Sequence, residues 1–315
     1  MLDKISDNIY KKKFQDKHLT LDGKKRAYVN FTGFETLWFN TGTLCNIQCK
    51  NCYIESSPKN DDLVYISKNE VIKYLDELEL YIDYKPKIIG FTGGEPFMNP
   101  EIINILNESL ERGYKVLVLT NAMKPIMRHC DSLIKIKQKY NSNLITRVSL
   151  DSFFEHIHDK HRGKNSWSKT ILGLTWLNNN GFNIKVASRI LDHKSENEIR
   201  DGFNNLFKEY KISLDAYNLD DLVIFPEMSN SFLTPEISND CWNIVSVKPD
   251  KLMCSNSRMV VKKKFSKEPN VQSCTLIPYD NNFNLGAKLH DSKVKVYLNH
   301  RHCSQFCVLG GSKCS

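Results

Sequence analysis

Short apolar runs alternate with helical patterns along most of the chain, from about residue 36 to about residue 226. Each run is rich in β-branched or other apolar residues and is bounded by turn or polar residues, which is typical of strands buried in a sheet. Six strands are predicted in this way, over residues 37–41, 87–92, 115–120, 145–150, 184–190 and 222–225.

The segments between these runs carry helix signals. Ser67 followed by Glu70 forms a capping box at the start of one helix. In the pair Asn99-Pro100 the proline is expected at the first turn of the next helix, and Gly113 lies just past the end of that helix. Two further helices are predicted over residues 170–180 and 198–210.

Strands that alternate with helices predict an α/β fold with a parallel sheet, because each right-handed crossover returns the chain to the same direction. Such sheets bind ligands at the carboxyl ends of their strands. After about residue 235 the helical periodicity fades, and residues 259–264 and 271–276 could form the two arms of a hairpin. We therefore expect three parts: an N-terminal extension over 1–35, an α/β unit over 36–235, and a second extension over 236–315.

Composition narrows the class of protein. The length of 315 residues suits one large α/β barrel. No apolar run reaches the roughly 18–20 residues that cross a bilayer, and the charged N-terminus lacks the apolar core of a signal peptide. We expect a cytoplasmic protein without a membrane partner. The net charge of +8 comes from scattered Lys and Arg, with no RNA-recognition or helix-turn-helix signature, so a nucleic-acid partner is not expected.

Ten cysteines without an export signal indicate metal or redox chemistry rather than a disulfide framework. Three of them have the spacing C-x₃-C-x₂-C directly after the first predicted strand: Cys45, Cys49 and Cys52. Three thiolates on a short loop can hold three irons of a cubane and leave the fourth iron without a protein ligand, whereas ferredoxin-type sites use four cysteines. Zinc is the alternative, but it ordinarily takes four ligands. Cys130 and Cys241 stand apart and are expected to be buried thiols.

The cysteine loop with Tyr53 after it, and Gly93-Gly94-Glu95-Pro96 after the second strand, resemble the radical S-adenosylmethionine (SAM) superfamily, in its branch with cysteine-rich SPASM or twitch extensions. The resemblance covers about residues 36–226 and, more loosely, 250–314. It implies a partial (β/α)₆ barrel and a [4Fe–4S] cluster whose free iron binds SAM and whose electron cleaves it to a 5′-deoxyadenosyl radical. One position departs from the family: Asn51 stands where an aromatic residue is common, so Tyr53 or Phe91 is expected to pack on the cluster.

The resemblance also implies which residues bind SAM. Gly93, Gly94, Glu95 and Pro96 are expected at its amino group, where a carboxylate can offset the ammonium charge and glycine permits close approach. The other candidates follow strands or lie just beyond them: Asn121, Ser149, Asp151, Arg162 and Ser188, with Arg189 beside Ser188. Three histidines in this region, His156, His158 and His161, are interpreted as a solvated loop rather than as a metal cluster.

Five further cysteines lie in the last part of the chain: Cys254, Cys274, Cys303, Cys307 and Cys314. Their layout resembles a SPASM or twitch extension, which implies one auxiliary [4Fe–4S] cluster held by Cys254, Cys274 and two or three of the other cysteines. A structural zinc is the alternative, because His300 and His302 stand beside Cys303. An auxiliary cluster could accept an electron from a substrate radical or, with an open iron, anchor the substrate.

The substrate class stays open at this stage. Maturation of a ribosomally made peptide is typical of SPASM-bearing relatives, but 35 residues before the first strand are too few for the peptide-recognition domain that many of them carry. A small metabolite or cofactor precursor is therefore favoured, with a peptide maturase or a methyltransferase as alternatives. A non-enzymatic two-cluster electron carrier is the alternative from another class. The resemblance implies a flavodoxin- or ferredoxin-type reductant.

Overall fold

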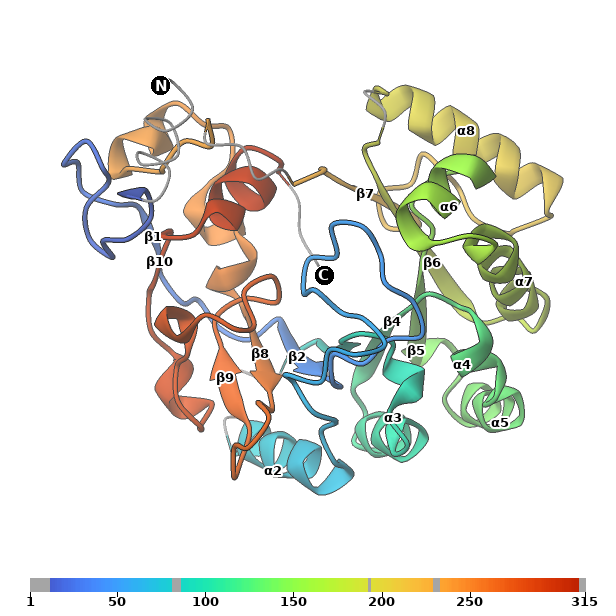
Figure 1. Ribbon diagram of the computed structural model, residues 1–315. Coiled ribbons are helices and arrows are strands. Elements are labelled where there is room, and N and C mark those ends of the chain that lie inside the picture. Colours follow the sequence, from blue (N-terminus) through green and yellow to red (C-terminus); the bar gives the residue numbers. More distant parts are fainter. Residues whose placement is uncertain (1–11, 81–85, 192–193, 229–232, 312–315) are drawn as a thin grey trace.

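The computed structural model describes residues 12–80, 86–191, 194–228 and 233–311. Its centre is an eight-stranded sheet in the order β7-β6-β5-β4-β3-β2-β8-β9 (Figure 1). The strands are β2 (Thr36–Asn40), β3 (Ile88–Thr92), β4 (Lys115–Thr120), β5 (Leu144–Ser149), β6 (Asn183–Arg189), β7 (Leu222–Phe225), β8 (Ser257–Val261) and β9 (Asn270–Gln272). All six strands predicted from the sequence are present, with ends shifted by one residue at most.

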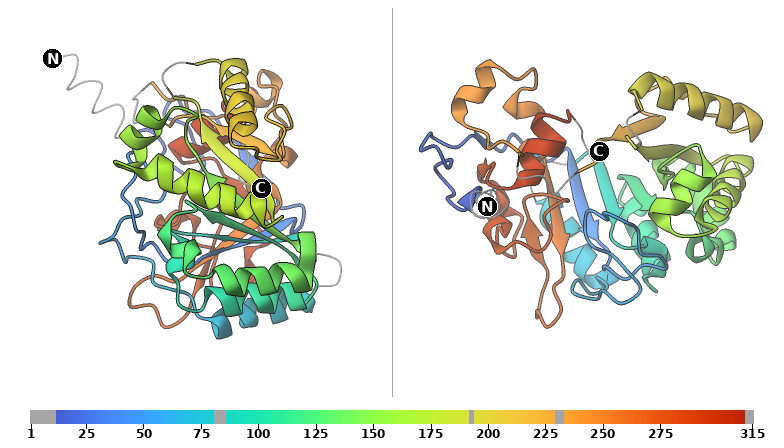
Figure 2. Two further views of the ribbon diagram at one scale, coloured as in Figure 1. Left: turned by 90° about the vertical axis from the view of Figure 1, so that its right-hand side faces the viewer. Right: turned by 45° about the horizontal axis from the view of Figure 1, so that its top comes forward.

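Strands β2 to β7 pair with their chain neighbours in parallel. Helices lie between them along the chain and cover the outer face of the curved sheet (Figures 1 and 2). No pairing joins β7 to β9 in the described part of the chain, so the curve stays open. The prediction of a partial (β/α)₆ barrel is confirmed.

The helices cover that outer face in chain order. They are α2 (Lys68–Glu79), α3 (Ile102–Glu111), α4 (Lys124–Met127), α5 (Cys130–Tyr140), α6 (Glu155–Arg162), α7 (Ser166–Asn179) and α8 (Glu196–Glu209). Short 3₁₀ turns are η2 (Pro96–Met98), η3 (Asn141–Asn143), η4 (Asn239–Asn243), η5 (Pro249–Lys251), η6 (Met253–Ser255), η7 (Asn281–Phe283) and η8 (His290–Ser292), and η9 (Cys303–Val308) is a π-helical turn. The predicted capping box of Ser67 and Glu70 is present at α2.

Two helix starts differ from the prediction. Helix α3 begins at Ile102, after Glu101, which makes no side-chain capping bond, and the Asn99 amide donates to Ile66 O. Helix α7 begins at Ser166, four residues before the predicted start at residue 170. There the Asp159 carboxylate accepts hydrogen bonds from the turn that precedes the helix and from its first residues. A helix N-terminus leaves such N–H groups without intrahelical partners.

The predicted solvated loop around His156, His158 and His161 is wrong. These residues belong to α6, and the His158 side chain is fully buried. The reason is a contact that no local pattern encodes: His158 Nδ1 accepts a hydrogen bond from the backbone N–H of Asp151, at 3.2 Å. The helix is thereby fixed to the end of β5.

The predicted hairpin is present as β8 and β9, which pair antiparallel. Strand β8 also pairs in parallel with β2, so the cysteine-bearing segment continues the central sheet. At the other end, β1 (Tyr28–Val29) pairs antiparallel with β10 (Val296–Tyr297), and Arg26 forms a buried ion pair with Glu236. Both flanking segments are thus in contact with each other. The boundaries at residues 35 and 235 stay predictions.

The side chains of β2 contact two separate clusters of buried apolar residues, one on each face of the sheet. Leu37 and Phe39 face the helices and belong to the larger apolar cluster, whereas Trp38 faces the inside of the barrel together with β8 and the C-terminal segment. This alternation follows from the two-residue repeat of a strand. The barrel interior is therefore lined by a second set of side chains, available for a site.

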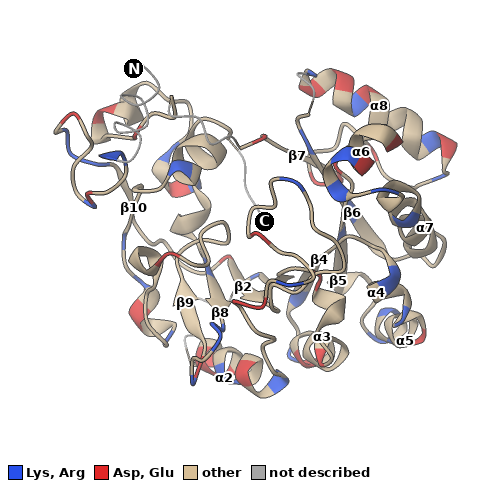
Figure 3. Ribbon diagram, viewed as in Figure 1, with Lys and Arg blue, Asp and Glu red and all other residues tan. Residues whose placement is uncertain are grey.

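Residues of both charge signs are mixed along α2 and α8, whereas α5 carries three lysines and one aspartate (Figure 3). Within the described residues, no helix is both long and apolar enough to span a bilayer.

Helix α7 should be sensitive to a single added methyl group at Gly173. A Cβ on Gly173 would overlap the carbonyl oxygen of Ala122, in the loop after β4. We expect Gly173→Ala to lower the free energy of unfolding by about 1–3 kcal/mol through overpacking. Leu172→Ala is the matched control, because Leu172 is 67% exposed on the same helix and should change stability by about 0.5 kcal/mol or less. Urea unfolding of both variants measures this, and equal midpoints would contradict the close approach.

Candidate functional site

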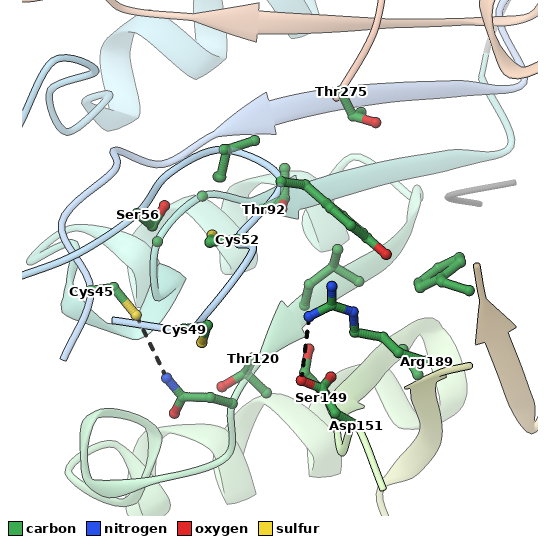
Figure 4. A pocket seen from close by; sticks show the side chains of 18 of the residues that line it. Cys45, Cys49, Cys52, Ser56, Thr92, Thr120, Ser149, Asp151, Arg189 and Thr275 are labelled. Carbon is green, nitrogen blue, oxygen red and sulfur yellow. Dashed lines mark hydrogen bonds and ion pairs between the residues drawn. The ribbon is translucent and has the colours of Figure 1, made fainter. Parts of the chain in front are cut away.

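A large cavity lies inside the barrel at the carboxyl ends of the strands, enclosing about 1170 Å³ of space with its open mouth included. Cys45, Cys49 and Cys52 lie along one side of it, and Ser149, Asp151 and Arg189 lie on the other (Figure 4). Seven of the nine predicted SAM residues line this cavity, as do Tyr53, expected beside the cluster, and Arg189: the seven are Gly93, Gly94, Asn121, Ser149, Asp151, Arg162 and Ser188. Glu95 and Pro96 are buried and lie outside its lining.

The glycine pair after β3 allows the cysteine loop to lie against the sheet. A Cβ on Gly94 would overlap the carbonyl oxygen of Leu44, and Gly93 has a φ of +148°, which disfavours other residues. The backbone N–H of Gly94 donates to Gly42 O at 2.8 Å. The glycine pair was expected to let its backbone approach SAM closely. In the structure, this backbone packs against residues 42–44, which lead into the cysteine loop.

Glu95 ties the ends of two strands together. Its carboxylate accepts hydrogen bonds from Thr120 Oγ1 and from the backbone N–H of Asn121, both at 2.8 Å. The side chain is 1% exposed, and burial raises its pKa to about 7, against the pull of these hydrogen bonds. Asn121 in turn donates to Asn46 Oδ1 at 2.9 Å, so the chain of contacts runs from Glu95 into the cysteine loop.

A buried ion pair closes the opposite side of the cavity. Arg162 Nη2 lies 2.8 Å from Asp151 Oδ1, and Arg189 Nη1 lies 3.8 Å from Asp151 Oδ2. Burial alone would raise the pKa of Asp151, but Arg162 and then Arg189 more than offset it and hold the pKa below the usual value. The neighbouring His158 is neutral, because burial lowers its pKa to about 3.

Glu227 is a site residue that the sequence analysis missed. It forms an ion pair with Arg189 and accepts a hydrogen bond from Asn51 Nδ2 at 2.7 Å. This contact explains why Asn51 stands where an aromatic residue is common: its amide fastens the cysteine loop to the segment after β7. The Arg189 guanidinium lies 5.2 Å from the centre of the Tyr53 ring. Glu227 follows the last barrel strand without any motif, so no local signal marks it.

Of the two aromatic residues expected beside the cluster, only Tyr53 lines the cavity. Phe91 instead stacks on Phe39 in the larger apolar cluster, which faces the helices. Tyr53 also donates from its hydroxyl to Pro226 O at 3.1 Å, next to Glu227.

The three thiols suit a group that brings positive charge. Burial raises the pKa of Cys45 to about 12 and also raises the pKa of Cys49, so thiolates at these two positions form more readily beside a cation. No three His, Cys, Asp or Glu side chains of the described residues stand close enough to bind one metal ion together. The thiols of a cubane site need not converge on one atom, because each thiolate binds a different iron. Three thiols at the edge of a large cavity meet this requirement.

A second, smaller cavity of about 360 Å³ is lined by four cysteines from separate elements: Cys254, Cys274, Cys303 and Cys307. Cys254 lies in η6 before β8, Cys274 follows β9, and the other two belong to η9. The remaining walls are mostly apolar, and His302 is among them. Burial raises the pKa of Cys254 to about 11 and that of Cys303 to about 12. Cys314 lies outside the described residues.

Cys130 and Cys241, expected to be buried, are half-buried. Neither of these two cysteines lines the cavities described above.

Residues 39–203 match the family model described as the radical SAM superfamily. The antilisterial bacteriocin subtilosin biosynthesis protein AlbA of Bacillus subtilis (strain 168) is 26% identical over 271 residues, which cover 80% of this chain and 57% of AlbA. GTP 3′,8-cyclase of Microcystis aeruginosa is 26% identical over 167 residues, 50% of this chain and 48% of the cyclase.

Two solved structures share the fold. Streptococcus suis SuiB bound to S-adenosylmethionine has a TM-score of 0.57 at 13% identity, and the match covers 81% of this chain and 63% of SuiB. The protein anSMEcpe with bound AdoMet has a TM-score of 0.53 at 14% identity, covering 82% of this chain and 80% of anSMEcpe. The chain thus spans about half the length of the curated relatives it matches, and less than two thirds of SuiB.

Replacing Glu95 should change how stability depends on pH. The ordinary pKa of 4.5 rises to about 7 in the folded protein. Between these two values the folded protein keeps a proton that the unfolded chain has released, so the free energy of unfolding falls as the pH rises through this window. We expect Glu95→Gln to remove that fall, which unfolding midpoints at about pH 5 and about pH 7.5 would measure.

Glu198→Gln is the control for the Glu95 prediction, because Glu198 belongs to the exposed capping box of α8. Hydrogen bonds from Ser195 lower the pKa of Glu198, so its contribution is lost as the pH falls, in the opposite sense. A Glu95→Gln variant with the same pH slope as the unaltered protein would show that Glu95 does not hold the buried proton.

Proposed function

Because the chain belongs to the radical SAM superfamily, we propose that it cleaves SAM at the Cys45–Cys49–Cys52 loop and starts radical chemistry on a peptide bound in the barrel. The observation that carries this proposal is the cavity itself. Three cysteines of one loop form one side of it, and the buried pair of Asp151 and Arg162 lies among the residues of the other side.

Cys45, Cys49 and Cys52 would hold the [4Fe–4S] cluster that enzymes of this superfamily use together with SAM. When bound, the reduced cluster supplies the electron that breaks the C5′–S bond of SAM and gives the 5′-deoxyadenosyl radical.

The residues around the cavity divide the recognition of SAM between them. Arg189 is shared between Asp151 and Glu227, whereas Arg162 pairs with Asp151 alone and lines the cavity, so its guanidinium can also reach the methionine carboxylate. We assign the carboxylate to Arg162. The backbone of Gly93 and Gly94 lies at the wall where the ammonium group is expected, with Glu95 and Pro96 buried in the turn behind it.

Polar side chains at the strand ends are available to bind the rest of SAM. Asn121 and Ser149 line the cavity directly. The Ser188 hydroxyl donates to Asp151 O at 3.0 Å, so Ser188 fixes the loop that carries Asp151. We propose that Asn121, Ser149 and Asp151 face the ribose or the substrate, and that Ser188 positions them.

Apolar side chains shield this region from water. Trp38, Leu119, Phe225, Leu276 and Phe306 line the same cavity. A carbon radical abstracts hydrogen from whatever it meets, so exclusion of water and of reactive side chains directs it to the substrate.

The choice of a peptide substrate departs from the preference of the sequence analysis for a small metabolite. It is supported by the similarity to AlbA, a bacteriocin biosynthesis protein, and by the fold shared with SuiB, which has been solved bound to the precursor peptide SuiA. The similarity to GTP 3′,8-cyclase covers only half of this chain.

We further propose that Cys254, Cys274, Cys303 and Cys307 hold a second [4Fe–4S] cluster. Four thiols around one cavity are enough to ligate every iron, which favours an electron-transfer role over a substrate anchor. A flavodoxin- or ferredoxin-type protein is the proposed reductant.

Loss of one loop cysteine should abolish SAM cleavage. We expect Cys49→Ala to lower the formation of 5′-deoxyadenosine by anaerobically reconstituted, reduced protein to background, because three thiolates are the minimum for the open-iron cluster. Cys130→Ala is the matched control and should keep full activity, since Cys130 is in neither cavity. Product is measured by chromatography. Activity in Cys49→Ala would refute the assignment of the loop.

Iron content should report the second cluster separately. We expect about eight irons per reconstituted chain and about four in the double variant Cys254→Ala/Cys303→Ala, because each cluster holds four. A wild-type value near four irons, accompanied by one zinc, would favour the zinc alternative.

The substrate class can be tested with the product of a short reading frame next to the gene. We expect that peptide to stimulate 5′-deoxyadenosine formation and to change in mass, with a peptide of scrambled sequence as the control. Stimulation by GTP and not by the peptide would instead favour a metabolite substrate.

A further inference from the structure

Arg258 is a buried cation beside the second cavity that the proposed reaction has not used. It lies on β8, and its side chain is 1% exposed. Within the part of the chain that the structure describes, its guanidinium donates hydrogen bonds only to backbone carbonyls, at 2.6–3.0 Å: those of Cys254, Ser257, Ser292 and Val294. The ring of Phe31 covers it, with the guanidinium carbon 4.5 Å from the ring centre.

No carboxylate among the described residues forms an ion pair with Arg258. Three other buried arginines do have one: Arg26 pairs with Glu236, Arg189 with Glu227 and Arg200 with Glu196. Carbonyl oxygens satisfy the N–H groups of Arg258 but leave its positive charge without a countercharge. A buried charge of this kind is strongly destabilising unless a negative group lies nearby.

The position of Arg258 in the chain brings it to the second cavity, because η6, which carries Cys254, leads directly into β8. Arg258 also binds the backbone of Cys254 directly, with Nη1 2.6 Å from the carbonyl oxygen. A negatively charged cluster on the four cysteines of the second cavity would therefore lie close to the positive charge of Arg258.

We propose that Arg258 is the fixed countercharge of the second [4Fe–4S] cluster and raises its reduction potential, which makes that cluster an electron acceptor. This inference rests on the proposed function, which places a cluster on the four cysteines.

The sign follows from the charges of the two redox states. An oxidised [4Fe–4S] cluster with four thiolates carries two negative charges, and one added electron makes three. A positive guanidinium nearby stabilises the more negative state more strongly, and the apolar surroundings weaken its screening. The reduced form is thereby favoured. In turnover the electron comes from the substrate radical, and it leaves to an external one-electron carrier of the flavodoxin or ferredoxin class.

The test isolates the second cluster in the full-length chain. Cys45→Ala/Cys49→Ala/Cys52→Ala removes the SAM-cleaving cluster, so a redox titration followed by EPR reports the second cluster alone. In this background we expect Arg258→Met to lower the equilibrium constant for reduction about tenfold, which for a one-electron couple is about 59 mV. Arg258→Lys keeps the charge and should stay closer to the unaltered residue.

A second variant neutralises the charge without removing the arginine. Phe31 is only partly buried and its ring lies on the guanidinium, so Phe31→Glu places a carboxylate against Arg258 and should lower the potential in the same direction. Arg200→Met is the matched control: Arg200 is also buried and also binds two carbonyl oxygens, but it lies on α8 at the other end of the sheet. It should leave the potential unchanged.

The possible results distinguish a failure of the inference about Arg258 from a failure of the proposed function. An unchanged potential in both Arg258→Met and Phe31→Glu, with the cluster present, overturns the inference and leaves the second cluster intact. If Arg258→Met does not take up iron, Phe31→Glu decides. Absence of iron from the triple-cysteine background overturns the second cluster and the inference with it, whereas SAM cleavage at the first loop is tested independently by Cys49→Ala.

Discussion

The contact between the cysteine loop and the glycine pair after β3 is the constraint on which the site depends. Gly93 and Gly94 lie where any side chain would collide with Gly42 or Leu44. The loop can therefore lie flat on the ends of β2 and β3, and the three cysteines reach the cavity from one side. Buried Glu95 then fixes the turn to β4 through Thr120 and Asn121.

A second set of contacts holds the same loop from the other side of the barrel. Arg189 bridges Asp151 and Glu227, and Glu227 binds Asn51 in the loop. The residues proposed to bind SAM are thus part of the scaffold that positions the cysteines. Each buried charge in this group has a partner of opposite sign, which keeps the cost of burying charge low.

The C-terminal segment adds to the barrel rather than standing apart from it. Pairing of β8 with β2 attaches the β8–β9 hairpin, which Cys254 and Cys274 flank, to the sheet that also carries the first loop, and one apolar cluster includes side chains from both parts. The sheet provides a rigid support between the two proposed clusters. In this arrangement Arg258, on β8, is bound directly to the backbone of one cysteine.

Local patterns in the sequence determined the alternation of strands and helices, the capping box at Ser67, the cysteine spacing and the hairpin, because each depends on residues close together along the chain. They did not reveal helix α6, since its burial depends on a bond between His158 and the backbone of Asp151. Nor did they indicate Glu227, whose partner Asn51 is 176 residues away.

Only the tertiary structure decided which distant groups meet. It joined β8 to β2, gathered Cys254, Cys274, Cys303 and Cys307 around one cavity, and surrounded Arg258 with backbone carbonyls and no carboxylate of the described residues. Spacing in the sequence carries the geometry of turns and periodic faces, but countercharges and shared cavities arise from packing between segments that no local signal connects.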